Sequence, residues 1–502
     1  MNKFYKYPTL ISFIPGLIFI PLLINIIINF HSGGIDVFNE FIYSSLSPNL
    51  DKEIILITLR RLNDTLRIAS VSWLISLLFG IILGTIASKV FYIILGLPIY
   101  INRSVRIILT IIRSLHELIW CLILMQFYGI NISTAIIAIC IPFTAINAKV
   151  ISEQLDNIVI KNIEAIIQIN GRNLSTLFTL IWSPIIQTIN NFGIYRFECA
   201  LRSTAVLGLF GVGGIGTSIY LSFQSFNFKE LWTYLWGLAL LIILLKHLLK
   251  KIKVHTINPK ISLSLFIISI FIFLYAGYFS LSFLIDFDSL NLNSQLTGNF
   301  SPFEIKLVPY EFLNLILETI CMSLFAICIA IALPPIMTLI FNHNLGRFFI
   351  RGIAFWLRII PPPVIMLLLL MFNRPSIALA AFTLGIHNAA ITSNLLFNNL
   401  DNLGREDYIA IKSIGAPKRI SWLLGLFSKQ AKSYISYCSY RADIIVRETA
   451  IVSSVGGIGL GWQLNESLSS FAWGEVIIIL FSYFSIAALG EIINGKIKSF
   501  LN

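Results

Sequence analysis

Two pairs of opposite charges lie inside long apolar runs of the sequence. Glu198 and Arg202 are four residues apart, and Asp443 and Arg447 repeat this spacing. Residues at i and i+4 share one face of a helix, so each acid can meet its arginine. An ionisable side chain inside a membrane span costs about 2.5–3.5 kcal/mol on insertion scales, which makes these four residues functional candidates. Two uses fit them: arginines that attract an anionic solute across a translocation path, or ion pairs that satisfy themselves and hold each helix in register.

Both pairs belong to a stretch that occurs twice. Residues 195–216 read YRFECALRSTAVLGLFGVGGIG, and residues 440–459 read YRADIIVRETAIVSSVGGIG. The numbering differs by 245 at the tyrosines and by 243 at the glycines, which a two-residue deletion explains. A match this ordered indicates two related halves. We predict halves at 1–255 and 256–502, with core units at about 62–250 and 312–495.

The composition predicts a polytopic membrane protein. The chain is 57% hydrophobic and 12% charged, whereas soluble domains carry about 25% charged residues. Apolar runs of about 20 residues, enough to span a bilayer, recur along its length. Backbone groups in lipid must bond internally, so the predicted fold class is all-α with about twelve transmembrane helices. The predicted spans are 8–30, 64–88, 104–128, 131–152, 185–212, 231–250, 261–284, 313–341, 348–371, 375–397, 433–455 and 472–493.

Lysines and arginines gather in the loops on one side of these spans. Lys89 and Arg103, Lys246 to Lys260, and Arg405 to Lys432 fall on the side that also holds both termini. The positive-inside rule makes this side cytoplasmic. Both halves then have the same orientation, as a parallel repeat with a pseudo-twofold axis along the membrane normal. We read the net charge of +12 as topological signal and contact with anionic lipid, with no nucleic-acid partner.

Nothing in the sequence indicates an enzyme. The six cysteines form no Cys-x-x-Cys pair and lie mostly in apolar segments, so we expect no metal site and no disulfide framework. No nucleophile–base constellation is present, and we assign no catalytic residue. The phosphate-binding pattern Gly-x-x-x-x-Gly-Lys-Ser/Thr is absent from the sequence, so we expect no ATP to be bound by this chain through that motif.

One long cytoplasmic segment precedes the repeated stretch in each half. Each contains a helical run, a glycine that can leave the helix with positive φ, and a second amphipathic run. The glycines are Gly171 and Gly415, 244 residues apart. This pattern predicts a short helix–turn–helix on the membrane surface. It would serve as a handle for a partner protein, or it is a plain interfacial loop.

The glycine-rich ends of the repeated stretch predict a helix break near the outer face. A break of this kind would be a tight turn closing an outer gate, or a nest of backbone N–H groups for an anion. In the same comparison of halves, His387 and Asn388 align with Phe143 and Thr144, so the histidine is not duplicated. The predicted gate-turn glycines are Gly213, Gly214, Gly216, Gly456, Gly457 and Gly459.

The first cytoplasmic loop resembles the loop signature of ABC importer permeases. Gly171 is followed ten residues later by Ile181 and three further by Pro184, and Glu164-Ala165 resembles the opening of the signature. In that family this loop forms a coupling helix that docks into the ATPase subunit. The second half departs from the pattern: Ile409-Ala410 stands in place of Glu-Ala before Gly415, and Gly425 and Ser428 replace the isoleucine and proline.

A more specific resemblance is to phosphonate ABC transporter permeases. Residues 202–209 read RSTAVLGL and lead to the GGIG of 213–216, which looks like that family's closing motif. Residues 113–118, RSLHEL, resemble its Arg-x-x-Pro-Glu element with His116 in the proline place. The second half keeps Arg358 and Pro361 but has Pro362 where the first has Glu117. Family permeases are usually single halves that dimerise, so this chain looks like two fused copies.

The resemblance implies a function and a set of partners. It implies a permease in the bacterial inner membrane that passes phosphonate, phosphite or a related anion into the cytoplasm, with one fused chain per transporter. ABC ATPase subunits would bind ATP and Mg²⁺ in trans, and a periplasmic binding protein would deliver the solute. Arg202 and Arg447 would face each other across the pseudo-twofold axis, because an arginine fork suits phosphorus oxyanions. The translocation-path candidates are Glu117, Glu198, Arg202, Asp443 and Arg447.

Three alternatives remain open. Methionine-type permeases share the glycine-rich ending, so the solute could be an amino acid or another small molecule. A secondary transporter would carry its own coupling-ion site and no handle loops. A channel would show pore-lining rings and a short filter sequence.

Overall fold

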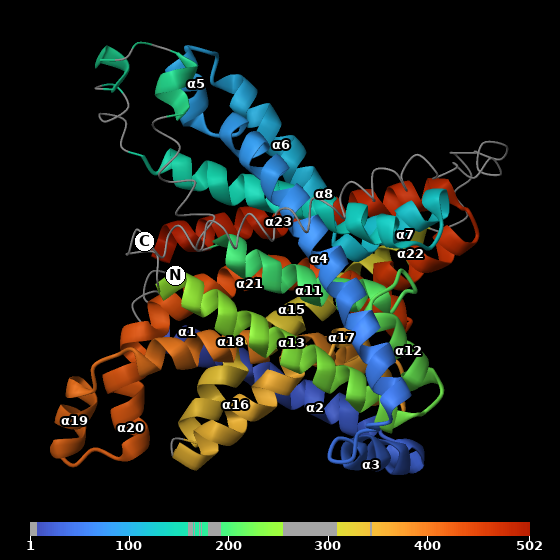
Figure 1. Cartoon of the computed structure of the whole chain (residues 1–502). Helices are drawn as coiled ribbons and strands as arrows, with labels where there is room; N and C mark the ends of the chain where they lie inside the picture. The colour runs from blue at the N-terminus through green and yellow to red at the C-terminus, as the bar shows by residue number, and fades with distance from the viewer. Residues whose placement is uncertain are drawn as a thin grey trace. The chain divides into compact units, whose positions relative to one another are not determined.

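The computed structural model describes residues 8–158, 164, 166–169, 171, 173–178, 192–254, 309–341 and 344–501. Within these residues the regular structure is helical, apart from one isolated bridge between Phe30 and Asn373. The predicted all-α class is confirmed. The chain forms two compact units, which we call the first unit (43–300) and the second unit (1–42 with 301–502) (Figure 1).

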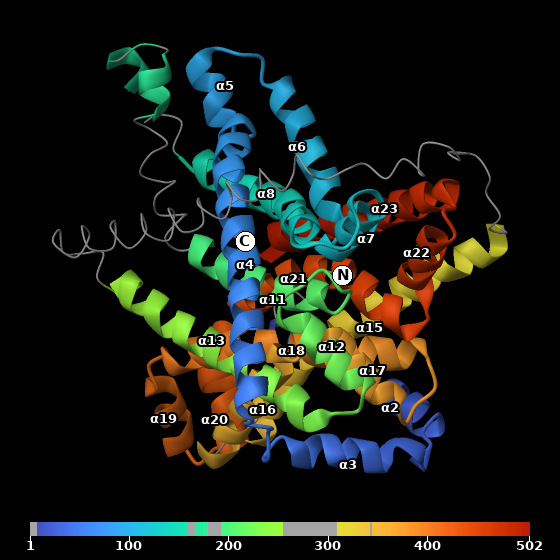
Figure 2. The same cartoon turned by 45° about the vertical axis from the view of Figure 1, so that its right-hand side comes forward.

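The first unit is built around α4, which Figure 2 shows running along its length with α5 at one end. A single helix of 35 residues spans about 52 Å, more than a hydrocarbon core needs. Its described helices are α4 (Lys52–Ile86), α5 (Lys89–Leu95), α6 (Tyr100–Ser114), α7 (Glu117–Tyr128), α8 (Ile132–Asp156), α11 (Ile194–Gly208), α12 (Ile215–Gln224) and α13 (Phe228–Val254). The short helix α3 (Ile35–Ser44) lies at the boundary of the two units.

The second unit repeats this order of helices. Its helices are α15 (Pro309–Ile340), α16 (Asn344–Ile359), α17 (Pro362–Leu370), α18 (Ile377–Asp401), α19 (Glu406–Ser413), α20 (Lys418–Trp422), the π-helical turn η6 (Leu423–Phe427), α21 (Ser428–Gly456), α22 (Gly459–Ser469) and α23 (Trp473–Leu501). From α6 and α16 onwards the starts of most equivalent helices are 244 or 245 residues apart. The sequence repeat is therefore also a repeat of structure.

The same pair of helices forms the centre of each unit. In the first unit, Gly80 and Gly84 bring α4 against α8, because a Cβ on Gly80 would lie 2.5 Å from the Cβ of Asn147. In the second unit the glycine lies on α18, the equivalent of α8, and not on α15, the equivalent of α4. A Cβ on Gly385 of α18 would lie 2.6 Å from the Cβ of Ile329 on α15. Small residues at such contacts let membrane helices pack backbone to backbone.

Two of the predicted spans are broken in the structure. The described residues contain six helices long and apolar enough to cross a membrane, or up to nine if each bent pair counts as one span. The predicted spans 104–128 and 348–371 are not single helices: α6 and α7 meet at 80°, and the α16–α17 pair at 98°. The predicted span 261–284 and the start of 185–212 lie outside the described residues, so the count of twelve stays a prediction.

The N-terminal helices pack on the second unit. These helices are α1 (Pro8–Phe13), the 3-10 turn η2 (Ile14–Ile18) and α2 (Phe19–Ile28), which together form one candidate span. A Cβ on Gly16 would lie 2.9 Å from Ile336 of α15, and Phe13 meets Phe427 edge-on at 5.7 Å. Figure 1 shows these blue helices among the yellow and orange ones. The compact units therefore differ at this end from the predicted halves 1–255 and 256–502, which stay a description of the sequence repeat.

Candidate functional site

The break between α6 and α7 places Glu117 at the start of a helix. Leu115 is extended (φ −89°, ψ 138°), and His116 caps α7, its Nδ1 accepting a hydrogen bond from the Leu118 N–H over 3.2 Å. A histidine that caps in this way begins α7 by accepting from one of its first N–H groups, and it stands where Pro361 caps α17 in the second unit. Glu117 is the first residue of α7, where the helix dipole favours a negative charge.

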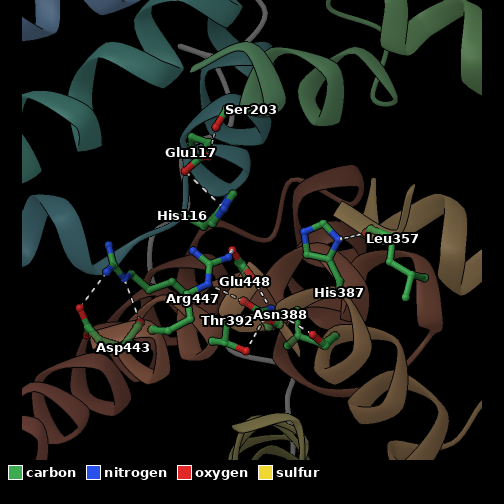
Figure 3. A network of polar contacts seen from close by, with 12 residues as sticks. His116, Glu117, Ser203, Leu357, His387, Asn388, Thr392, Asp443, Arg447 and Glu448 are labelled. Carbon is green, nitrogen blue, oxygen red and sulfur yellow. Dashed lines mark hydrogen bonds and ion pairs between the residues drawn. The ribbon is translucent and has the colours of Figure 1, made fainter. Parts of the chain in front are cut away.

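Glu117 connects α7 to α11. Its Oε1 accepts a hydrogen bond from the Ser203 hydroxyl on α11, and its Oε2 lies 3.3 Å from Nε2 of His116. Because Nδ1 of His116 accepts from a backbone N–H, the neutral ring carries its proton on Nε2, facing the carboxylate. Figure 3 shows Ser203, Glu117 and His116 in one line of contacts.

The second unit has its carboxylate on the other helix. Pro362 stands at the position of Glu117, and Glu448 of α21 stands at the position of Ser203, each 245 residues on. Three prolines, 361 to 363, start α17 there, since a proline suits the first helical turn. Each unit therefore keeps one carboxylate at this contact, supplied by α7 in the first and by α21 in the second.

Glu448 neutralises a buried arginine. The Nη2 of Arg441 donates to Glu448 Oε1 over 2.9 Å, and its Nε donates to Asn388 Oδ1 over 2.6 Å. The Asn388 amide in turn donates to Glu448 Oε2 over 2.7 Å (Figure 3). All three side chains are buried. A buried charge is stable when it is paired and its remaining hydrogen-bonding groups are satisfied, and this triad meets both conditions.

Arg196, the equivalent arginine of the first unit, has a different environment. It is buried on α11, with its Cζ 3.7 Å from the centre of the Phe143 ring, and its Nε and Nη2 have no hydrogen-bond partner. The predicted register is wrong by one residue, because Phe143 and not Thr144 is equivalent to Asn388. The helix caps Asn131 and Ser376, 245 residues apart, were the sequence signal that gives the correct register.

The two charge pairs predicted from their spacing both form. Arg202 pairs with Glu198 within α11, and Lys246 of α13 approaches the same carboxylate to 3.3 Å. In α21 the Nη2 of Arg447 lies 2.8 Å from Asp443 Oδ2, and its Nε donates to the Asp443 carbonyl over 3.1 Å. Each arginine is thus engaged with an acid of its own helix. Arg202 lies in the first unit and Arg447 in the second, so the expectation that they face each other depends on how the units are arranged and stays a prediction.

The glycine-rich stretches break their helices, as predicted. Gly213 and Gly214 have positive φ between α11 and α12, and Gly457, after α21, and Gly459, the first residue of α22, also have positive φ. In both units a threonine anchors the helix that follows: Thr65 accepts from the Ile215 N–H over 2.8 Å, and Thr319 accepts from the Leu460 N–H over 3.0 Å. Gly456 is the last residue of α21, and Gly216 lies in the first turn of α12.

These hydrogen bonds help to decide between the two roles predicted for the glycine turns, a closing turn and a nest of N–H groups for an anion. The Gly459 N–H is bonded to Glu318 Oε2 over 3.0 Å, besides the two threonine bonds. The Ile215 N–H at the start of α12 and the Gly459 and Leu460 N–H groups at the start of α22 are thus bonded to protein groups and not available to an anion. A closing turn is the use that this geometry favours, and the outer-gate role stays a prediction.

The handle predicted around Gly415 is a helical hairpin. Ala410 lies in α19, Gly415 turns the chain with φ +90°, and α20 follows. Figure 1 shows α19 and α20 projecting from the ends of α18 and α21. Gly425 lets η6 pack closely against α19, because a Cβ on Gly425 would lie 2.7 Å from the Cα of Tyr408. The isoleucine side chain next to the turn, Ile414, is 83% exposed.

The first loop shows the same turn. Gly171 has φ +76°, and Thr176 donates from its hydroxyl to the Gly171 carbonyl over 2.9 Å. Ile169 beside it is 80% exposed. Glu164 is helical, whereas Ala165, Ile181 and Pro184 lie outside the described residues. The two turns therefore agree in backbone geometry and in carrying an exposed isoleucine.

Several curated proteins resemble this chain. A protein named as the permease of a cryptic phosphonate transport system from Escherichia coli (strain K12) is 25% identical over 24% of this chain and 99% of its own length. A protein named as a phosphite transport system permease from Stutzerimonas stutzeri is 26% identical over 30% of this chain and 57% of its own. A phosphate-import permease protein from Mycolicibacterium smegmatis (strain ATCC 700084 / mc(2)155) is 24% identical over 24% of this chain and 22% of its own.

The chain covers less than two thirds of the second and third of these relatives. No protein-family model matches the chain. A solved structure of an amino acid ABC transporter aligns with 38% of this chain and 91% of its own, at 15% identity and a TM-score of 0.31. The relatives confirm what the motifs predict: this chain resembles the permease proteins of phosphonate-type ABC transporters.

Proposed function

We propose that this chain is the transmembrane permease of an ABC importer, a transport subunit driven by ATP hydrolysis on a separate subunit. The observation that carries the proposal is the hairpin α19–Gly415–α20. It presents the nearly fully exposed Ile414 at its turn, and an apolar side chain placed in this way favours a protein contact. ABC ATPase subunits, with their ATP and Mg²⁺, are the partners that would dock there, as the loop resemblance implies.

The hairpin is attached to the helix that carries the charged site. Beyond η6 the chain continues into α21, a helix of 29 residues that ends at the Gly456–Gly457 break. At 1.5 Å per residue this helix is about 43 Å long, and it holds both Arg441 and Asp443. A push on the hairpin would thus move the charged residues and the glycine turn together, which is how an external ATPase could gate a passage.

The proposed solute is a phosphorus oxyanion, delivered by a periplasmic binding protein. The three relatives are named for phosphonate transport, phosphite transport and phosphate import, and these solutes share a tetrahedral phosphorus with anionic oxygens. Arg196 on α11, whose Nε and Nη2 have no hydrogen-bond partner, supplies the matching positive charge. We place the chain in the bacterial inner membrane with both termini cytoplasmic, because the lysine-rich and arginine-rich loops lie on that side.

Uptake by cells tests this proposal. The gene would be deleted in its own host and restored on a plasmid, and uptake of labelled phosphate, phosphite and methylphosphonate would be measured at low concentration. We expect at least one of the three to depend on the restored chain. Equal uptake of all three in the deleted and restored strains would contradict the proposed solute class.

A further inference from the structure

The two equivalent arginines use the same two nitrogens differently. In the second unit, Nε and Nη2 of Arg441 are bonded to Asn388 and Glu448. In the first unit, Nε and Nη2 of Arg196 are the two atoms without a partner. The reason lies in the sequence: Phe143 and Ser203 stand where Asn388 and Glu448 stand, and neither offers the arginine a carboxylate.

The acid of α11 and the acid bonded to α11 already have other partners. Glu198 is bonded to Arg202 and Lys246, and Glu117 is bonded to Ser203 and His116. The Phe143 ring covers one face of the Arg196 guanidinium. A ring face attracts a cation, but it leaves the N–H groups at the edge of the guanidinium without acceptors. Arg196 is only 5% exposed, so this arrangement leaves a buried cation in need of an anion.

The two vacant nitrogens form one edge of the guanidinium. Their N–H bonds point in parallel, which matches two oxygens of a single carboxylate or phosphorus oxyanion. In the second unit, the Glu448 carboxylate and the Asn388 oxygen fill this edge. An anion bound in the first unit would take the place that Glu448 holds in the second.

From this comparison we propose that Arg196 is the residue that binds the transported anion, and that Glu448 closes the equivalent place in the second unit. The identity of the anion as a phosphorus oxyanion rests on the proposed function. The first unit then holds the anion site, and in the second unit the Glu448 carboxylate occupies the equivalent place beside Arg441. The two atoms are closed off in this structure, so loading requires α11 and Phe143 of α8 to separate.

Two readouts test this inference on the purified full-length chain and on cells. The first is the rise in unfolding temperature that phosphate, phosphite or methylphosphonate produces in the chain in detergent. The second is the KM for uptake of the same solutes. Arg196→Gln should abolish the rise in unfolding temperature and increase KM about tenfold or more. Arg196→Lys keeps the charge but loses the two parallel N–H bonds, so its temperature rise and its KM should lie between those of the wild type and of Arg196→Gln.

The control is Arg61→Gln, which removes an arginine of α4 that is 42% exposed and lies 3.9 Å from Asp64. It should keep KM within about threefold of the wild type, since an exposed ion pair contributes little. The inference is overturned if Arg196→Gln leaves both the temperature rise and KM unchanged, or if Arg61→Gln is as damaging as Arg196→Gln. Binding that depends on Arg196 without any uptake would instead overturn the proposed function and leave the anion site standing.

Discussion

The guanidinium of Arg441 lies 2.9 Å from the carboxylate of Glu448, seven residues further along the same helix. This pair has no equivalent in the first unit, where Ser203 stands at the position of Glu448. In the first unit the acid moves from α11 to Glu117 on α7, where it holds Ser203 and leaves Arg196 without a carboxylate. The exchange of one acid between two helices thus leaves the buried arginine of one unit paired with a carboxylate and the buried arginine of the other without a partner for Nε and Nη2.

The Arg441–Glu448 pair should show strong coupling in a double-mutant cycle. Arg441→Met leaves a buried carboxylate without its cation and should lower the free energy of unfolding by about 3–5 kcal/mol. Adding Glu448→Leu should recover most of that loss, because the unpaired carboxylate is then removed. Chemical unfolding in detergent measures each variant. Losses that simply add in the double variant would show that the two side chains do not depend on each other.

The close contact of α11 with α12 should not tolerate a methyl group. A Cβ on Gly216 would lie 2.1 Å from the Ala205 carbonyl oxygen, and one on Gly461 would lie 2.8 Å from the Ala450 oxygen. Either glycine changed to alanine should cost about 1–3 kcal/mol of unfolding free energy. Gly352→Ala is the matched control: it lies in α16 with nothing within 4 Å and should be neutral or slightly stabilising. A control as unstable as Gly216→Ala would refute the steric argument.

The threonines that anchor α12 and α22 should contribute equally in the two units. Thr65→Val and Thr319→Val keep the shape but leave the Ile215 and Leu460 N–H groups without an acceptor, which should cost about 1–3 kcal/mol each. Thr85→Val removes a hydroxyl that bonds only within its own helix and should change little. Thermal unfolding in detergent would compare the three, and a Thr85 variant that loses as much as the others would count against the anchor.

His116→Pro should be tolerated by the backbone. His116 already has φ −71°, and Leu115 before it is extended, as a residue preceding proline prefers. The variant loses the cap on Leu118 and the contact with Glu117, so we expect a loss of about 1 kcal/mol, similar to that of His116→Ala. A loss from His116→Pro several times that from His116→Ala would mean that the α6–α7 bend needs the histidine N–H.

An acidic residue at the hairpin tip should uncouple the chain from its partner without unfolding it. Ile414→Glu places a charge where the native side chain is exposed, so the unfolding temperature should stay within about 2 °C of the wild type. Uptake should fall at least fivefold if this side chain docks an ATPase. Ile169→Glu is the matching change in the first unit. Full uptake by both variants would contradict docking at these turns.

The sequence predicted the elements that depend on local chemistry. The repeat, the ion pairs at i and i+4, and the helix breaks at the glycines follow from spacing and from backbone preference, and all of them are found. The bend at His116 escaped prediction because a histidine in an apolar run carries no breaker signal, even though Pro361 marks the equivalent place in the second half.

Longer-range partners could not be read from the sequence. The apolar run at 8–30 could pack on either half, because apolar surface does not specify its partner, and the structure places its helices on α15 and α18. The importance of Arg196 depends on which residues of α8 and α11 face it. That arrangement becomes visible only when Phe143, not Thr144, is recognised as the equivalent of Asn388.

The most direct test of the central claim is the energy source of uptake. Membrane vesicles from the restored strain would be loaded with ATP, supplied with the binding protein and the labelled solute, and then treated to collapse the proton and sodium gradients. We predict that uptake continues with ATP and stops when ATP is replaced by a non-hydrolysable analogue. Uptake that follows an ion gradient and ignores ATP would show that the chain is not driven by an external ATPase.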